Sequence, residues 1–416
     1  MIKLFIKKEL LENIFSFKFL IMFLLMFFSL NTAIFIMTKD YKARLQNYDI
    51  LKPSKNEAFA ITYPTPFSIF AHGLDDNICN LYQITFGGQI ETGSQKQAIN
   101  KIYNFFNTPD LLYIINIILS FCAILFASDL ITREKEQGTL KLIFSNGIKR
   151  PAFSLGKWIG GYITLIIPIV LSVLFGLIFF IILAKIPFQF SDFIRLLIFL
   201  FFVLVYLAGF FSLGLFISIV SRSSAFSMFF SLIVWVSLVF IIPRSGNLVA
   251  KQFINIPSVQ TIEIKRSQIF IKAIFEYINS HYEKSKIPQG IINQQNDKIR
   301  EDYLNKLNAV ESIARKITSI SPASDLTFLC TDLCNTGFRE EQRFKTFVIM
   351  FKEQVKNFDS DSDGNLVGDF TPFSYARSPL SDFFNLAMML HFSILIMYIL
   401  IPVILGYYAF LKFDVR

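Results

Sequence analysis

Six apolar stretches of the chain contain no Asp, Glu, Lys or Arg and are long enough, or nearly so, to cross a membrane. They cover residues 19–37, 111–128, 158–184, 196–220, 226–242 and 383–411. A membrane-spanning helix needs about 20 apolar residues, whereas a membrane β-barrel would show alternating segments of about ten residues. The pattern therefore predicts an all-α integral membrane protein with six transmembrane helices.

The composition supports this prediction. Of the 416 residues, 53% are hydrophobic, only 17% are charged, and 50 are Phe. A soluble protein of this length needs more charged residues to cover its surface, so an ordinary soluble enzyme is excluded. No small-residue cleavage site follows the first apolar stretch. We therefore expect it to remain as a membrane anchor and not to be removed as a signal peptide.

Basic residues are concentrated on one side of the predicted topology. Segments 1–18, 129–157 and 412–416, together with Arg222 in the connection after the fourth span, contain 13 basic and six acidic residues. The long connections on the other side are nearly neutral and comprise residues 38–110 and 243–382. Because Lys and Arg accumulate in cytoplasmic loops, both termini are predicted to be cytoplasmic. Topology thus explains the basic excess, and we expect no nucleic-acid partner.

The two long connections differ in their patterns. Residues 38–110 are rich in Pro and Gly, and we expect short helices mixed with irregular structure there. Residues 243–382 are predicted to form a mostly helical extracytoplasmic domain. Apolar residues recur in it at spacings of three and four, first around Ile271–Tyr282 and again around Ile299–Ile317, with a break at Pro288. This pattern predicts two antiparallel helices.

The connection 129–157 combines charged residues with an amphipathic pattern. Arg133, Glu134 and Glu136 precede a short helix that would place Leu140 and Phe144 on one side. Asn-Gly at 146–147 and Pro at 151 then return the chain to the membrane. The segment is either a surface helix that offers its charges to a partner or a solvated loop with ordinary topology charges.

The sequence Asp129-Leu-Ile-Thr-Arg-Glu-Lys-Glu-Gln-Gly-Thr-Leu-Lys-Leu142 resembles a segment of permease subunits of ABC transporters of the type-2 exporter class. The six-span plan is similar, and residues 1–18 match the amphipathic elbow segment of that class. The large insert before the last span, with Ile320–Ser324 and the ending Phe413–Arg416, is similar to a subfamily that includes gliding-motility and copper-enzyme-maturation permeases. The resemblance implies a multi-pass protein of the cytoplasmic (inner) membrane of a bacterium.

The resemblance also implies a role for the segment between spans two and three. In that class it forms a coupling helix that contacts the ATPase subunit, which assigns the contact here to Arg133, Glu134, Glu136, Gly138, Thr139 and Leu140. Two ATPase subunits and a second permease, of the same or similar sequence, are the implied partners. ATP and magnesium would bind to the partner ATPase, because Gly156-Lys157 lacks the remaining residues of a phosphate-binding loop.

The function expected from these observations is ATP-driven export of an amphipathic or lipid-like substrate. One alternative is a mechanical relay or membrane anchor that acts on an extracytoplasmic protein partner without transport. A membrane-embedded enzyme is the weaker alternative, since the chain has only three His and neither a zinc-binding His-Glu-x-x-His motif nor a nucleophile elbow.

Several residues within the predicted spans are candidates for helix contacts. Small residues four positions apart allow helices to approach closely in lipid, either within the chain or across a dimer. They are Gly156, Gly160, Ala208, Ser212, Gly214 and Ser218. Asn116 and His391 are isolated polar residues in spans, and each either bonds to a neighbouring helix or contacts substrate.

An acidic segment begins like a calcium-binding loop, with Asp at positions one, three and five and Gly at position six. Its candidate ligands are Asp359, Asp361, Asp363, Asn365 and Asp369. Position twelve is Phe370 instead of Glu, so a solvated acidic turn is the alternative. Three of the four cysteines, Cys79, Cys330 and Cys334, lie on the predicted outer side and allow one disulfide, whereas Cys122 lies in a span.

Overall fold

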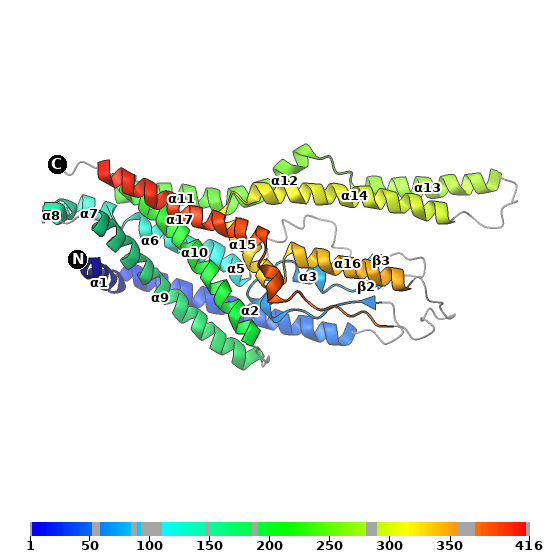
Figure 1. Ribbon diagram of the computed structural model, residues 1–416, viewed down its shortest axis with the longest axis horizontal. Coiled ribbons are helices and arrows are strands. Elements are labelled where there is room, and N and C mark those ends of the chain that lie inside the picture. The colour runs from blue at the N-terminus through cyan, green and yellow to red at the C-terminus, as the bar shows by residue number, and fades with distance from the viewer. Residues whose placement is uncertain are drawn as a thin grey trace.

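The computed structural model describes residues 2–51, 59–84, 90–92, 110–145, 150–184, 190–279, 289–355 and 371–412. It confirms six helical segments that are long and apolar enough to cross a membrane, and they run roughly along the long axis of the molecule (Figure 1). In chain order they are α2 (Phe17–Leu51); α5 (Leu111–Ile114) with η3 (Ile115–Leu119) and α6 (Ser120–Ser128); α9 (Arg150–Ala184); α10 (Phe190–Val220); α11 (Ser224–Val236) with η4 (Ser237–Ile241) and α12 (Ile242–Phe253); and α17 (Leu386–Lys412).

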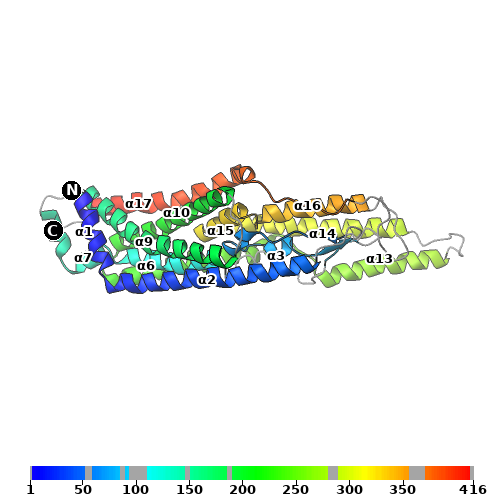
Figure 2. The ribbon, with the colours of Figure 1, turned by 90° about the horizontal axis from the view of Figure 1, so that it is seen from below.

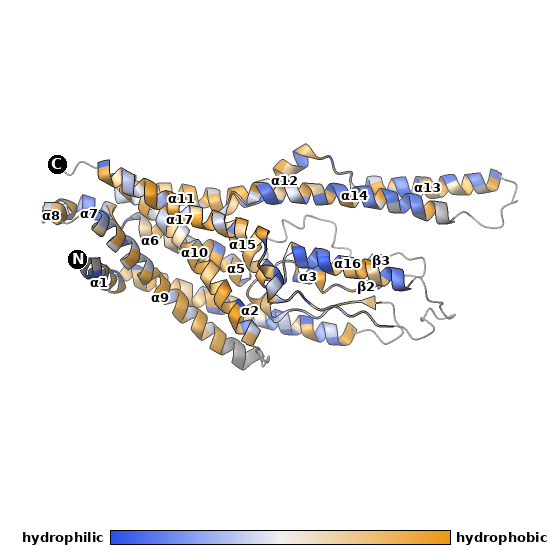
Figure 3. Ribbon diagram, in the orientation of Figure 1, coloured by the Kyte–Doolittle hydropathy of each residue, from blue (hydrophilic) through white to orange (hydrophobic). Residues whose placement is uncertain are grey.

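The elements outside these helices gather at the two ends of the molecule. What we call the proximal end contains α1 (Ile2–Ile14), α7 (Thr132–Glu136), α8 (Thr139–Ser145) and the last turn of α17. The distal end contains α13 (Val259–Asn279), α14 (Gln289–Thr318), α16 (Phe338–Val355), α3 (Asp75–Ile78) and a small sheet (Figures 1 and 2). The helices in the centre of the molecule are coloured mainly as hydrophobic, whereas the helices of the distal end mix both classes (Figure 3). This division matches a membrane part and a part in water.

The helix bounds differ from the apolar stretches in instructive ways. Helix α2 continues to Leu51, well beyond the predicted span 19–37, because charged residues end a membrane segment without ending a helix. The fifth span passes through Pro243 without a break. The preceding π-helical turn η4 lets the chain accommodate a proline, which lacks the N–H of an α-helical bond. Helix α17 begins at Leu386, after a short 3-10 turn at Leu380–Phe383 (η5).

Helix α10 is the centre of the membrane part. It packs against α6 on one side and α17 on the other, and its Phe202, Tyr206, Phe210 and Phe211 are fully buried. These rings join the main hydrophobic cluster, which also includes residues of α2, α6 and α9. The strongly apolar sequence of this span therefore reflects burial by protein as well as by lipid.

The distal end contains both expected and unexpected structure. Helices α13 and α14 are the two antiparallel helices predicted in the long second connection, and α14 lies along α12. Gly246 of α12 permits this approach, since a Cβ there would lie 2.4 Å from Thr318 Cγ2. The first connection also contains a three-stranded antiparallel sheet, which our prediction omitted: β1 (Phe59–Ala60), β2 (Tyr82–Ile84) and β3 (Ile90–Thr92). Strands of two or three residues are too short to show alternation.

Between the membrane part and the distal end lies α15 (Pro322–Leu333), which packs against α10 and α17. Ser321 caps its first turn by accepting a hydrogen bond from the Ala323 N–H at 3.2 Å. Nearly every residue of α15 is buried. The helix therefore anchors the distal elements to the membrane part.

Candidate coupling site

The segment that follows the second span folds into two short helices at the proximal end, α7 and α8. Gly138 separates them with a φ of +70°, a left-handed conformation that favours glycine. No atom lies within 4 Å of the position that a Cβ would take at Gly138, so the backbone conformation and not crowding explains the residue. The tight turn places α8 beside α7, where both contact the ends of other helices.

A buried group of three charges joins α7 to α9 and α1. Lys157 Nζ lies 2.7 Å from Glu134 Oε1 and 2.8 Å from Glu9 Oε2. The three side chains are 6–12% exposed. Two carboxylates so close together require the lysine charge between them, since an unpaired buried charge is strongly unfavourable. The ion group therefore ties the elbow helix, the coupling segment and the third span to one another.

Close packing supports the same junction. A Cβ on Gly156 would lie 2.9 Å from Phe5 Cβ, and one on Gly160 would lie 2.8 Å from Glu9 Cβ. These two glycines therefore let α1 lie directly on α9, within one chain. The face of α9 that carries Gly156 and Gly160 is therefore covered by α1.

Two neighbouring side chains of α7 bond to the facing ends of α10 and α11. Lys135 Nζ donates to the carbonyl oxygens of Ser218, Ile219 and Ser221 at the end of α10. The Glu136 carboxylate accepts from both the backbone N–H and the hydroxyl of Ser224, each at 2.8 Å. A cation at a helix C-terminus and an anion at a helix N-terminus are the favourable placements. Helix α7 thus holds the turn between the fourth and fifth spans.

Neighbouring helices pack closely against the small residues of α10 or form hydrogen bonds with them. Ser218 Oγ accepts the backbone N–H groups of Ile131 and Thr132, both at 3.1 Å. A Cβ on Gly214 would lie 2.4 Å from the carbonyl oxygen of Ile124. Ser212 Oγ accepts a hydrogen bond from Trp158 Nε1 at 2.9 Å and donates one to the carbonyl oxygen of Ala208. Both Ser212 and Ala208 are buried. These positions make contacts between helices of one chain.

Helix α8 and the first turn of α9 contact the end of α17. Leu140 is buried, and the Phe144 ring contacts those of Phe153 and Phe410 at centroid distances of 5.5 and 5.7 Å. Arg150 Nη1 donates to the carbonyl oxygens of Phe410 and Leu411, at 3.2 and 2.6 Å. The last span is therefore held by an aromatic cluster and by a cation at its C-terminal end.

The start of α2 is fixed to the end of α6 by a further ion pair. Lys18 Nζ lies 2.6 Å from Asp129 Oδ1 and also donates to the carbonyl oxygen of Leu125 at 3.2 Å. The coupling segment thus begins with a contact to the first span. Together, the bonds of residues 129–157 reach α1, α2, α10, α11 and α17.

The six residues assigned to an ATPase contact divide into inward and outward groups. Glu134 and Leu140 face the protein, and the Thr139 hydroxyl donates to the carbonyl oxygen of Glu134 at 3.3 Å. Arg133, Glu136 and Gly138 are exposed, with the Glu136 carboxylate bonded to Ser224. Gln137 and Leu142 are also exposed, Leu142 by 66%. The outward surface therefore lacks Glu134, Thr139 and Leu140 of the predicted set and adds Gln137 and Leu142.

Sequence reasoning missed the partners of Glu134. From the sequence, Glu9 is only part of the elbow segment, and Lys157 is one of the basic residues of the predicted cytoplasmic side. A signal for Lys157 was present: it stands between Gly156 and Trp158 at the head of an apolar span, where a charged side chain needs a partner. The distance of 148 positions between Glu9 and Lys157 hid which residue that partner was.

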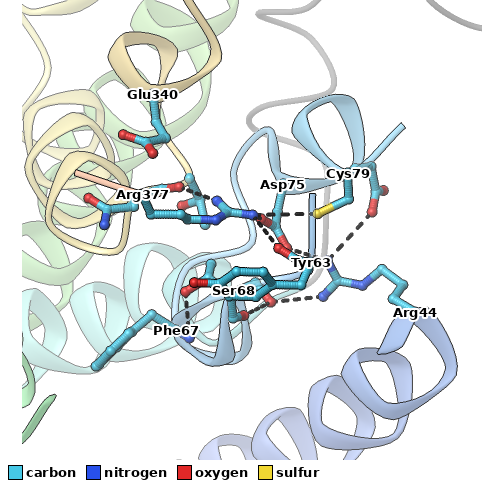
Figure 4. A network of polar contacts seen from close by, with 12 residues as sticks. Arg44, Tyr63, Phe67, Ser68, Asp75, Cys79, Glu340 and Arg377 are labelled. Atoms are coloured by element: carbon cyan, nitrogen blue, oxygen red, sulfur yellow. Dashed lines mark hydrogen bonds and ion pairs between the residues drawn. The ribbon is translucent and has the colours of Figure 1, made fainter. Parts of the chain in front are cut away.

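A second network of buried charges lies at the distal end (Figure 4). Asp75 is fully buried, and its carboxylate lies 2.6 Å from Arg44 Nη1 and 2.8 Å from Arg377 Nη2. Arg44 also donates to Ser68 Oγ, and Arg377 to the carbonyl oxygens of Tyr63 and Asn335. The network connects the extension of α2, the α3 region and the segment before the last span.

The electrostatics of this network follow from burial and charge. Burial favours the neutral form of Arg377, but the Asp75 charge outweighs it and raises the pKa of the guanidinium. Burial likewise raises the pKa of the nearby Cys79 thiol well above its ordinary value. Glu340 accepts from the Tyr375 hydroxyl at 2.8 Å and from Ser378 Oγ at 2.7 Å, which extends the network to α16. None of these residues was singled out from the sequence except Cys79.

The two polar residues in spans bond to α15. Asn116 Nδ2 donates to Thr327 Oγ1 at 2.9 Å, and His391 Nδ1 lies 2.6 Å from Asp325 Oδ1. Burial raises the pKa of Asp325 to about 6, against the lowering effect of the His391 hydrogen bond and charge. Both residues therefore make helix contacts within the chain.

The sequence also offered candidates for a disulfide and for a calcium site. All four cysteines are free thiols, so the structure contains no disulfide between Cys79, Cys330 and Cys334. The candidate calcium loop, with Asp359, Asp361, Asp363, Asn365 and Asp369, lies outside the described residues. Within the ranges that the structure describes, no group of three or more His, Cys, Asp or Glu could hold a metal ion.

A small apolar cleft with a cavity volume of about 20 Å3 lies among the first four spans. All of its lining residues are apolar, and they come from α2, α5, η3, α9, α10 and Phe70 after η1 (Pro66–Ile69). They are Leu30, Ile34, Phe70, Leu111, Ile115, Leu119, Ile169, Val173, Leu196, Phe199, Leu200 and Val203. The cleft has a composition that suits hydrocarbon and disfavours a polar solute.

Almost the whole chain is similar to a known protein family. A family model described as an ABC-2 family transporter protein matches residues 4–415, nearly the whole chain. No curated protein matches the sequence. Because the family model extends from the elbow helix through the distal elements to the last span, the chain belongs to the ABC-2 family of transporter permeases.

Proposed function

We propose that this chain is the permease subunit of an ATP-driven exporter in a bacterial inner membrane, with the proximal end in the cytoplasm. It would act with two ATPase subunits, which bind ATP and magnesium, and with a second permease. Family membership supports the transporter role. The observation that carries the coupling proposal is the set of bonds from residues 129–157 to five other helices.

These bonds give a physical route for coupling. Most of them join the short segment to the end of a helix, and they include a buried ion group, helix caps and aromatic contacts. A displacement of α7 and α8 would therefore be passed on to whole helices, which move as rigid bodies. A solvated loop would have no such connections, and this difference argues against the alternative of ordinary topology charges.

The outward surface of the segment is the proposed ATPase contact. It consists of Arg133, Gln137, Gly138 and Leu142, with the exposed Glu136 beside them. A leucine that is 66% exposed and an exposed arginine on the same short segment are the residue types of an interface anchor and its polar rim. Glu134 supports this surface from within through Lys157.

The apolar lining of the cleft, and not its small volume in this structure, supports an amphipathic or lipid-like substrate. It lies between spans whose proximal ends the coupling segment holds, so a change in their spacing would change the width of the cleft. A hydrocarbon chain needs no polar partner in such a site, whereas a polar solute would leave its hydrogen-bonding groups unpaired.

The proposal is tested by reconstituting the chain with its ATPase subunit in liposomes and measuring ATP hydrolysis and movement of a fluorescent phospholipid. Leu142→Glu is expected to lower binding of the ATPase and the stimulation of hydrolysis, because it places a charge at the centre of the contact. Leu304→Glu is the control, since Leu304 is an exposed leucine of α14 at the other end of the molecule. Equal behaviour of the two variants would refute the assigned contact.

One observation also favours the mechanical-relay function. Helix α14 packs along α12, which continues the fifth span, so movement of that span would reach the distal hairpin directly. In this case the liposome assay would show coupled ATP hydrolysis without any movement of lipid. Phospholipid movement that depends on ATP would instead support export.

A further inference from the structure

Helix α13 has two apolar faces, and a neighbouring helix covers one of them. Ile262 and Ala273 are buried on the side where α14 packs. Ile264, Phe275 and Ile278 are 58%, 61% and 49% exposed. Successive residues of a helix are rotated by about 100°, which places these three side chains on the face opposite Ile262 and Ala273. In both ribbon views α13 lies at the edge of the distal end, with α14 on one side (Figures 1 and 2).

The exposed face follows a seven-residue repeat. Ile264, Ile271 and Ile278 are exactly seven positions apart, and Gln268 and Phe275 each follow an isoleucine by four. Alternating spacings of four and three are typical of the contact seam of a coiled coil. The repeat extends over three heptads of a 21-residue helix. An ordinary surface helix has no need of such a repeat on its outer side.

Among the residues that the structure describes, no element covers this stripe, so in a single copy it faces water. Helix α13 is not among the six helices apolar enough to span a membrane, and it runs in the general direction of those spans beyond their distal ends. A helix lying in the membrane surface would instead run across that direction. Large exposed apolar stripes of soluble segments mark sites of protein contact.

We propose that α13 pairs with α13 of a second copy of this chain, in parallel, across a two-fold axis along the membrane normal. All copies of a membrane protein insert with the same orientation, so the α13 helices of two neighbouring copies point the same way. A two-fold axis then brings the same face of each helix into contact. This surface goes beyond the proposed function, because it concerns how two permeases associate in the distal region.

The charges beside the stripe fit a parallel pair. Lys265 and Lys272 flank the seam on one side, and Gln260 and Ser267 flank it on the other. In a parallel pair each lysine faces Gln260 or Ser267 of the second helix, whereas an antiparallel pair would place lysines opposite each other. Gln268 lies within the seam, where its amide can bond to the same residue of the second copy and fix the register.

Three heptads are short for an isolated coiled coil in water. Confinement of both copies to one membrane, in one orientation, raises their effective concentration and compensates for the short seam. The contact of α14 with the opposite face of α13 also keeps each helix ordered before pairing. The second copy therefore meets a helix that is already formed.

The test is cysteine cross-linking of the full chain in its native membrane. Thr261→Cys, Gln268→Cys and Phe275→Cys are introduced one at a time, and each sample is oxidised and separated without reductant. All three are expected to shift from monomer to dimer, because parallel helices place each of these residues opposite itself. Antiparallel helices would allow at most one of them to do so.

Two controls make the result specific. Glu263→Cys is exposed on α13 but lies to the side of the seam, and it is expected to remain monomeric. The chain with only its four native cysteines gives the background. Adding Ile271→Glu to Phe275→Cys is expected to abolish the dimer band without changing the amount of protein in the membrane, since the stripe is exposed within each copy.

Dimer formation at Glu263→Cys equal to that at the seam, or none at the seam, would overturn the proposal. ATPase stimulation is measured on the same variants. A chain that stimulates hydrolysis normally but does not cross-link through α13 would refute this contact and leave the proposed permease function standing.

Discussion

Different groups of buried charges join the helices at the proximal end and at the distal end of the molecule. At the proximal end one short segment makes many bonds, and the buried ion group there is a lysine between two carboxylates. At the distal end one carboxylate lies between two arginines, and it joins segments that are far apart in the sequence. The proximal segment also presents an outward surface, whereas Asp75 and Arg377 are fully enclosed.

Under the proposed function, this difference would separate a moving part from a rigid frame. Lysine offers a point charge that can keep contact while its neighbours shift, and the arginine fork fixes both distance and orientation. We therefore expect the distal network to contribute more to stability and the proximal group more to coupling. The following changes test that division, beginning with the largest expected effect.

Asp75→Asn is expected to be the most destabilising change. It leaves Arg44 and Arg377 buried without their carboxylate, and breaking a buried ion pair costs about 3–5 kcal/mol. The measurement is thermal unfolding of the detergent-solubilised protein. Asp40→Asn is the matched control: it removes a half-exposed partner of the same Arg44, and such a pair contributes only about 0.3–0.5 kcal/mol.

Lys157→Met tests the proximal group. It leaves Glu9 and Glu134 close together without a cation, so we expect a loss of about 3 kcal/mol, at the lower end of the range for a broken buried pair. The triple variant Glu9→Gln, Lys157→Met and Glu134→Gln removes all three charges and is expected to recover most of this stability. If the group serves coupling, the triple variant will fold but stimulate its ATPase less. A fully coupled triple variant would contradict the division.

Gly160→Val tests packing without charge at the same junction. Its first added atom would lie 2.8 Å from Glu9 Cβ, so α1 must move away from α9, and overpacking of this kind costs about 1–3 kcal/mol. Gly138→Asn is the comparison at an uncrowded glycine, because asparagine tolerates the left-handed conformation. We expect unfolding to shift for Gly160→Val and to change little for Gly138→Asn.

The membrane part could be predicted from the sequence because each span is a local feature. A charge-free apolar run of about 20 residues predicts a spanning helix without reference to the rest of the chain. Every predicted span lies largely within one observed helical segment. The turn at Gly138 and the short helix after it were predicted for the same reason. The paired helices α13 and α14 likewise followed from local periodicity.

The contacts that organise both ends could not be predicted in this way. Asp75 lies in a turn-rich segment and pairs with Arg377, 302 positions away. Each of these residues alone resembles an ordinary surface charge, and only the fold shows that they are buried together. The family resemblance assigned Glu134 to an outward contact, although its partner Lys157 lies only 23 positions further along the chain, in α9.

The smallest effect is expected from the pH dependence of the distal end. His72 is buried, and its Nε2 lies 3.1 Å from Asp76 Oδ2. Burial lowers the pKa of His72, but the hydrogen bond and charge of Asp76 outweigh it, so the pKa lies above its ordinary value of 6.5. The charged pair therefore stabilises the fold fully below pH 6.5, and this stability is lost as the pH rises through the raised pKa.

His72→Gln removes this titration, so the variant should lose less stability than the parent chain between about pH 6 and about pH 8. Thermal unfolding at the two pH values measures the difference. We expect the effect to be smaller than that of Asp75→Asn, because Asp76 is 66% exposed and water screens the pair. A parent chain that becomes more stable as the pH rises, with a variant that does not, would show that His72 is neutral in the folded protein and that Arg44 controls the charge of Asp76.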